Sequence, residues 1–271
     1  MVGFLRSGGA LSALVVCAGM TISAARCEEA GPSLGVQAIS PDLCMQMKAH
    51  HVLNAGAPVG CDGLKLVRFS YVDFGGNSHD DGEIVVMDAI AKHVSQIFKE
   101  LESRKFPIAR ARLMNEYDGN DDASMDQDNT SAFNHRKITG GGSISLHAYG
   151  VAIDLNPEQN PYVRRAGGAL TISPRSGRKY LNRKNARPGM SEEVIKVFAE
   201  HGLSGWGGFW KNPTDYQHFQ ISKRLADTLI HASPDVAAER YEHHIQRYLA
   251  CLHTKNMPKQ VSIQRVCANV D

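Results

Sequence analysis

The chain has 271 residues, which is enough for one sizeable hydrophobic core or two small ones. Its 30 basic and 28 acidic side chains give a formal net charge of +2. A balance so close to zero offers no basis for a nucleic-acid-binding protein or for a protein held on an anionic membrane surface. The composition is otherwise ordinary for a globular protein.

Residues 1–25 are predicted to be a secretory signal peptide. Arg6 precedes an apolar run over about 10–22, and small residues end the segment. The run is too short to span a bilayer comfortably, although a retained N-terminal anchor is the alternative. Arg26 directly before Cys27 argues against a lipidated cysteine. We therefore expect an exported protein, periplasmic or extracellular, with no stable membrane span.

Export changes the interpretation of the cysteines, because an oxidising compartment favours disulfides. The local pairings are Cys44 with Cys61 and Cys251 with Cys267. Four cysteines allow three connectivities, so the other two pairings stay open. Cys27 is left as the odd one.

Apolar patterning predicts alternating strands and helices in the first half of the mature chain. The strand 64–74 is rich in Val, Phe and Tyr, and apolar residues recur at helical spacing between Ile90 and Leu101. The expected elements are a polar lead-in 26–40, a helix 41–53, strands 64–74 and 84–87, a helix 88–103, a strand 106–113 and a long polar loop 115–142.

The second half continues with a strand 151–155 and a segment 156–190 of little periodicity. A helix is expected over 191–201, with Ser191 as its N-cap and Gly202 ending it. A strand 218–222 and a last helix 235–255 follow. This order predicts an α+β fold, with helices on a mainly antiparallel sheet.

Two short segments supply the residue types of a catalytic zinc site. His147, Asp154 and His218 provide two imidazoles and a carboxylate, and Asp215 is a spare carboxylate that can act as a general base. An odd separation on a straight strand puts side chains on opposite faces, so His147 and Asp154 require a bend between them. We place that bend at Gly150 and the residue before it, because glycine accepts backbone angles that other residues resist.

The strand that begins at His218 alternates, with His218, Gln220 and Ser222 on one face and Phe219 and Ile221 on the other. Spacing alone also allows a purely structural interpretation. In it, the histidine is hydrogen-bonded inside the core, and Asp154 belongs to a turn or a cap. The chain has 12 histidines, so chance pairings with acids are easy to find. We expect four of them, His50, His51, His243 and His244, to lie on the surface.

The motifs resemble the VanY-like D-alanyl-D-alanine carboxypeptidase family, which comprises zinc peptidases of the hedgehog/DD-peptidase fold. The family pattern S-x-H-x-x-G-x-A-x-D followed by D-x-x-H stands here as SLHAYGVAID (145–154) and DYQH (215–218). Further similar blocks are SYVDFGG…GEIVV (70–86), SAFNHR (131–136), NPYV (160–163) and WGGFW (206–210). The similarity covers roughly residues 66–222. One departure is His135, where the family commonly has cysteine.

The resemblance implies a role for each matching residue. His147, Asp154 and His218 would bind Zn²⁺, and Asp215 would take a proton from water at the metal. Arg136 would hold a substrate carboxylate or the developing oxyanion, for which its planar fork is suited. The alternative is that Arg136 is a solvated loop residue or forms a structural ion pair.

The resemblance also implies a function and a domain organisation. We expect an exported zinc peptidase that cleaves peptidoglycan stem peptides at a D-Ala-D-Ala or an L-Ala-D-Glu type bond. The alternative is a non-catalytic zinc module that binds cell-wall peptide or a partner, and the retained spare carboxylate favours an enzyme. The expected parts are a signal peptide 1–25, an N-terminal extension 26–63, the zinc peptidase domain 64–222 and a helical extension 223–271. Four aromatic residues would either wall the cleft or simply pack: Tyr149, Trp206, Trp210 and Tyr216.

Overall fold

The computed structural model describes residues 33–138, 141–254 and 266–267. The predicted signal peptide and Cys27 lie outside these residues. Within the described part of the chain, no helix combines the length and the apolar character that crossing a membrane requires.

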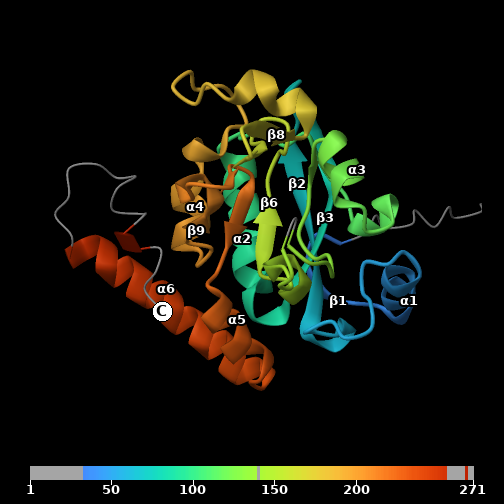
Figure 1. Cartoon of the computed structure of the whole chain (residues 1–271). Coiled ribbons are helices and arrows are strands. Elements are labelled where there is room, and N and C mark those ends of the chain that lie inside the picture. Colours follow the sequence, from blue (N-terminus) through green and yellow to red (C-terminus); the bar gives the residue numbers. More distant parts are fainter. Residues whose placement is uncertain (1–32, 139–140, 255–265, 268–271) are drawn as a thin grey trace, which may run out of the picture. The chain divides into compact units, whose positions relative to one another are not determined.

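The fold is α+β with mainly antiparallel sheets, as the sequence predicts (Figure 1). The helices are α1 (Pro41–Ala49), α2 (Asp88–Ser103), α3 (Asp121–Asp126), α4 (Ile195–Glu200), α5 (Lys223–Ile230) and α6 (Pro234–Thr254). The strands are β1 (Gly35–Ala38), β2 (Leu64–Val72), β3 (Ser78–Met87), β4 (Arg110–Ala111), β5 (Asn129–Thr130), β6 (Ala152–Asp154), β7 (Tyr162–Ala166), β8 (Ala169–Ser173), β9 (Gly205–Trp206), β10 (Thr214–Asp215) and β11 (His218–Gln220). Short 3₁₀ turns are η1 (Cys61–Gly63), η2 (Met114–Tyr117), η3 (Leu146–Tyr149), η4 (Arg175–Tyr180), η5 (Ser191–Glu193) and η6 (Gly207–Phe209).

Strand β2 is the centre of an antiparallel sheet in the order β1-β2-β3. Successive side chains of a strand point to opposite faces, and both faces of β2 are covered. Val67 and Phe69 join the main core with α2, where Phe69 stacks on Phe98 with ring centroids 3.7 Å apart. Leu64 and Leu66 join a second cluster beside α1. Burial on both faces explains why this strand is so rich in apolar residues.

Most predicted elements of the first half are present, with several corrections. The expected lead-in 26–40 contains β1, and the helix expected over 41–53 ends at Ala49. The helix 88–103 is confirmed as α2, and the strand 84–87 is the end of the longer β3. The expected strand 106–113 shrinks to β4, which pairs in parallel with β5. The expected loop 115–142 contains η2, α3 and β5, because local side-chain caps such as Asn120 on the amide of Ala123 organise its polar sequence.

A second sheet has the order β6-β11-β9 and is backed by the core. Phe219 of β11 faces that core and stacks on Phe198 of α4, with ring centroids 3.9 Å apart. The expected helix 191–201 begins as η5 and continues as α4. Ser191 is not its side-chain cap: it is the first residue of η5, and its buried Oγ has no hydrogen-bond partner.

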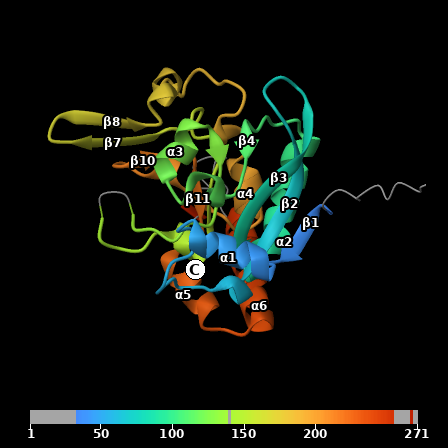
Figure 2. The ribbon, with the colours of Figure 1, turned by 90° about the vertical axis from the view of Figure 1, so that its right-hand side faces the viewer.

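A third sheet has the order β10-β7-β8, and two of its strands lie in residues 156–190, where the sequence has little periodicity and no strand is predicted. β7 and β8 form a hairpin that extends outward beside β10 and α3 (Figure 2). Its turn is made by Gly167 and Gly168, both with positive φ, of 55° and 79°. Such a pair is the usual choice for a two-residue hairpin turn, so the sequence did contain a signal for it.

Both expected local disulfides are present. Cys44 is bonded to Cys61, and Cys251 is bonded to Cys267. The second bond anchors the end of α6, a helix that packs against α2, α4 and α5 and confirms the predicted last helix. One surface prediction is wrong, because His244 is buried under this helix with Nε2 3.0 Å from the carbonyl oxygen of Gly202.

Candidate metal centre

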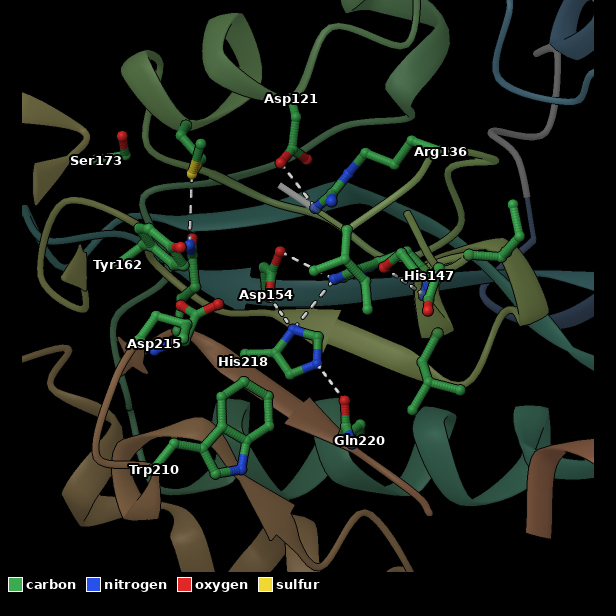
Figure 3. Close-up of a pocket in the computed structure, with 18 of the residues that line it drawn as sticks. Asp121, Arg136, His147, Asp154, Tyr162, Ser173, Trp210, Asp215, His218 and Gln220 are labelled. Atoms are coloured by element: carbon green, nitrogen blue, oxygen red, sulfur yellow. Dashed lines mark hydrogen bonds and ion pairs between the residues drawn. The ribbon is translucent and has the colours of Figure 1, made fainter. Parts of the chain in front are cut away.

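A cavity of about 410 Å³ opens where the second and third sheets meet α3 and the segments 136–138 and 143–146. Among the residues that line it are Asp121, Arg136, His147, Asp154, Tyr162, Trp210, Asp215, His218 and Lys223. Figure 3 shows the two histidines and Asp154 pointing toward one another in its centre. The structure thus brings all five sequence-predicted site residues to one cavity.

Strand pairing places two of the metal-ligand candidates. β11 runs antiparallel to β6 with His218 directly opposite Asp154. Opposed residues of an antiparallel pair point to the same face, so the imidazole and the carboxylate must meet there. His218 Nδ1 lies 2.9 Å from Oδ1 of Asp154. The predicted alternation of this strand is confirmed, since Phe219 and Ile221 are buried on the other side.

The third candidate, His147, arrives on the turn η3, which lies just before β6. Ser145 caps this turn by accepting a hydrogen bond from the amide of His147. Gly150 ends it in the left-handed region, with φ 68° and ψ 27°, where the sequence places the bend. The bend brings Nε2 of His147 to 3.0 Å from Asp154 Oδ2 and 3.2 Å from His218 Nδ1.

Neighbouring groups fix which nitrogen of each imidazole faces the shared centre. Nδ1 of His147 lies 2.6 Å from the carbonyl oxygen of Ala132, and Nε2 of His218 lies 2.7 Å from Oε1 of Gln220. Both partners are acceptors, so each of these nitrogens carries a proton and donates. When both imidazoles are neutral, the opposite nitrogens, which face Asp154, have free lone pairs, and this arrangement is typical of metal-binding histidines.

Sequence reasoning missed both supporting partners. Gln220 had a signal, because it lies two residues beyond His218 on the same face of the predicted strand. Ala132 contributes a backbone oxygen, so nothing in its side chain could point to it. Its neighbour Ser131 bridges to Asp154 through two backbone hydrogen bonds of 2.9 Å, which is how the SAFNHR block reaches the site.

The donor set fits a divalent metal ion. One atom from each of His147, Asp154 and His218 lies within 4.8 Å of the others, and the residues described contain no other such group. Burial opposes the charged form of His218, yet the adjacent Asp154 carboxylate outweighs it and raises the pKa of His218 to about 9. Two neutral imidazole nitrogens and one carboxylate match the ligands that zinc takes in catalytic sites.

Asp215 lies beside this group without belonging to it. Its Oδ1 is buried and has no hydrogen-bond partner. Burial, and then the charge of Asp154, raise the pKa of Asp215 to about 7. A buried carboxylate oxygen without a partner is costly unless something else occupies the cavity. The orphaned oxygen therefore supports a site that is completed by a ligand or water next to a cation.

Arg136 lines the same cavity and is already paired. Its Nη2 lies 2.7 Å from Oδ2 of Asp121, and both side chains are about three-quarters covered. Burial raises the pKa of Asp121, while the charge of Arg136 opposes that rise. The predicted ion pair is therefore present. Arg136 also lies on the cavity wall, where a substrate could reach it. No sequence signal singled out Asp121.

The four aromatic candidates divide into two kinds. Trp210 lines the cavity, and its ring centroid lies 5.4 Å from that of His218. Trp206 is buried in the core and donates from Nε1 to the carbonyl oxygen of Tyr216. Tyr149 is buried under the ammonium group of Lys223, which lies 4.6 Å from the ring centroid. Of these four residues, Trp210 alone forms part of the cavity wall.

Replacing Gly150 with alanine is expected to destabilise the protein by roughly 1–3 kcal/mol. This is the usual cost of holding a non-glycine residue in the left-handed backbone conformation that Gly150 adopts. A Cβ atom there would also meet the backbone nitrogen of Met87 at 2.6 Å. Denaturant unfolding measures the change. Gly142→Ala is the control, because a Cβ at that position meets nothing within 4 Å. Equal stability of the two variants would show that the bend does not need glycine.

The fold and the site together define a class: an α+β domain in which a His-Asp-His group that could hold a metal ion lies beside a second carboxylate, that of Asp215. Residues 139–221 match the model of the family described as D-alanyl-D-alanine carboxypeptidase, which confirms the resemblance predicted from the sequence. The matched segment contains His147, Asp154, Asp215 and His218. Comparisons with curated proteins and with solved structures found no match.

Proposed function

We propose that the protein is an exported, zinc-dependent peptidase that hydrolyses peptidoglycan stem peptides. The observation that carries the proposal is the convergence of two imidazoles and two carboxylates on one cavity within the segment that matches a peptidase family. The two disulfides are consistent with export.

In this proposal, different residues of the cavity have different roles in hydrolysis. His147, Asp154 and His218 would hold the zinc ion, which acts as a Lewis acid toward water and the peptide carbonyl. Asp215 accepts a proton from the attacking water and returns it to the leaving amine, a role that its pKa near 7 suits. Arg136 binds a substrate carboxylate or the oxyanion through the part of its guanidinium that Asp121 leaves free.

The scissile bond is either D-Ala-D-Ala or an L-Ala-D-Glu type bond. The two bonds can be distinguished by incubating the purified mature chain with muropeptides, once with zinc and once with a chelator. Mass spectrometry then identifies the products. Loss of one terminal alanine indicates a carboxypeptidase, and an internal cut indicates an endopeptidase. A protein that binds one zinc ion but leaves every muropeptide intact would instead be a non-catalytic binding module.

Zinc affinity is expected to fall by about ten-fold for each unit of pH below 9, because the ion must displace one proton from the pair of His218 and Asp154. The sign follows from the pKa of His218, raised to about 9 in the absence of metal, so that this imidazole is protonated at neutral pH. Competition with a zinc-binding dye between pH 5.5 and 7.5 measures the slope. An affinity independent of pH would exclude these imidazoles as ligands.

A further inference from the structure

The third sheet forms one wall of the cavity through a row of side chains. Asp215 of β10 is opposite Tyr162 of β7, and Tyr162 is opposite Ser173 of β8. Residues opposed across antiparallel strands point to the same face. All three line the cavity, and Figure 3 shows them on the same side of it.

The next row on this face lies two residues farther along each strand of the hairpin. Arg164 follows Tyr162 by two positions and is opposite Thr171. At about 3.3 Å per residue, its Cα lies roughly 7 Å beyond that of Tyr162, which is within the reach of an arginine side chain. Burial raises the pKa of Tyr162, while the charge of Arg164 opposes the rise, so the guanidinium lies near the cavity-lining phenol.

The hairpin and the segment that follows it are strongly basic, although the Asp215 carboxylate lies in the neighbouring row on the same face. Between residues 162 and 190 the chain has eight basic residues and no acidic one: Arg164, Arg165, Arg175, Arg178, Lys179, Arg183, Lys184 and Arg187. Neighbouring acids pair with two of them, Glu158 with Lys179 and Glu192 with Arg183. Arg164 is half-buried and has no ion-pair partner among the residues that the structure describes. The near-zero net charge of the whole chain conceals this local excess.

We propose that Arg164, supported by the hydroxyl of Thr171, binds a carboxylate of the substrate and selects acidic peptides. The inference rests on the proposed function and adds a determinant of specificity on the hairpin, away from the metal group. A guanidinium binds a carboxylate through two parallel hydrogen bonds. Stem peptides that contain D-Glu carry such a carboxylate within two residues of either candidate bond.

The position of Arg165 provides a matched control. It is the next residue of β7, carries the same charge, is exposed, and points to the opposite face of the hairpin. Its hydrogen bonds with Asn212 use the backbone, so a change of its side chain leaves them in place. A purely long-range effect of charge would be the same for both arginines, whereas a direct contact would depend on Arg164 alone.

The test measures binding of a synthetic stem pentapeptide with D-Glu at its second position, and of the same peptide with the carboxylate amidated. Wild-type protein should bind the acidic form at least about ten-fold more tightly, as expected for a hydrogen-bonded charge pair. Arg164→Gln should bind both peptides with the affinity that the wild type has for the amidated one. Arg164→Lys should keep part of the preference for the acidic peptide. Arg165→Gln should behave as wild type. Thermal unfolding confirms that each variant is folded.

Three outcomes would overturn the inference: no preference in the wild type, a preserved preference in Arg164→Gln, or an equal loss in Arg165→Gln. The proposed function is tested separately by turnover of the same peptides. Cleavage without an acidic preference would leave the function standing and remove the role of Arg164. An Arg164-dependent preference without cleavage would support the binding role and remove the catalytic proposal.

Discussion

Replacing Asp215 with asparagine is expected to lower kcat by about 10²- to 10⁴-fold, the range that general acid–base groups contribute. Asparagine has nearly the same size and cannot accept the proton that water releases. The buried Oδ1 of Asp215 has no protein partner, so the substitution breaks no hydrogen bond at that atom. Zinc content should stay at the wild-type value, because this residue lies outside the His-Asp-His group. Steady-state kinetics and metal analysis of the same preparation measure both effects.

The control for this variant is Asp126→Asn. Asp126 is exposed on the last turn of α3, so its replacement removes the same charge from the protein surface. Its kcat should match the wild type. Undiminished turnover in Asp215→Asn would remove the general-base role, and loss of zinc from that variant would instead make Asp215 part of the metal-binding group.

Replacing His147 with alanine is expected to abolish stoichiometric zinc binding and, with it, hydrolysis. The affinity should fall by more than about 100-fold, since even residues that merely support a ligand cost 10- to 100-fold when they are removed. Nε2 of His147 lies 3.0 Å from Asp154 and 3.2 Å from His218, so the loss leaves two of the three donors. Competition titration and elemental analysis measure the affinity and the stoichiometry.

His243→Ala is the control for that experiment, because His243 has a 61% exposed side chain on α6. It should bind zinc as tightly as the wild type does. Unchanged zinc stoichiometry in His147→Ala would make the ligand assignment wrong. Loss of zinc from both variants would indicate general destabilisation, which denaturant unfolding would reveal.

The sequence predicted those parts of the fold that depend on local pattern. The helix 88–103 was located to the residue because its apolar spacing is regular and a strand runs directly into it. The hairpin at 162–173 was missed because its strands are short and half-exposed, with arginines at two of the five β7 positions. The Gly167-Gly168 pair is the local signal for this hairpin, because both residues adopt positive φ in its turn.

The functional site was also predictable only in part from the sequence. The motif spacing identified both histidines and both aspartates, and the need for a bend identified Gly150. Strand alternation also places Gln220 on the same face as His218, but alternation alone does not indicate that its amide supports this histidine. Asp121 lies in a polar segment with no periodic signal, and it reaches Arg136 only because α3 folds over the cavity.

By itself, the sequence determined which residues can bind a metal, where the chain must bend, and which cysteines are near enough to pair locally, because each depends on residue chemistry and short spacing. Only the tertiary structure decided that β10 would pair with the β7–β8 hairpin and that Tyr162 would lie on the cavity wall. It also decided that the backbone oxygen of Ala132 would orient the imidazole of His147. The pairing of β10 with β7 joins strands that are far apart in the chain and that no short turn connects, so no local pattern sets their register.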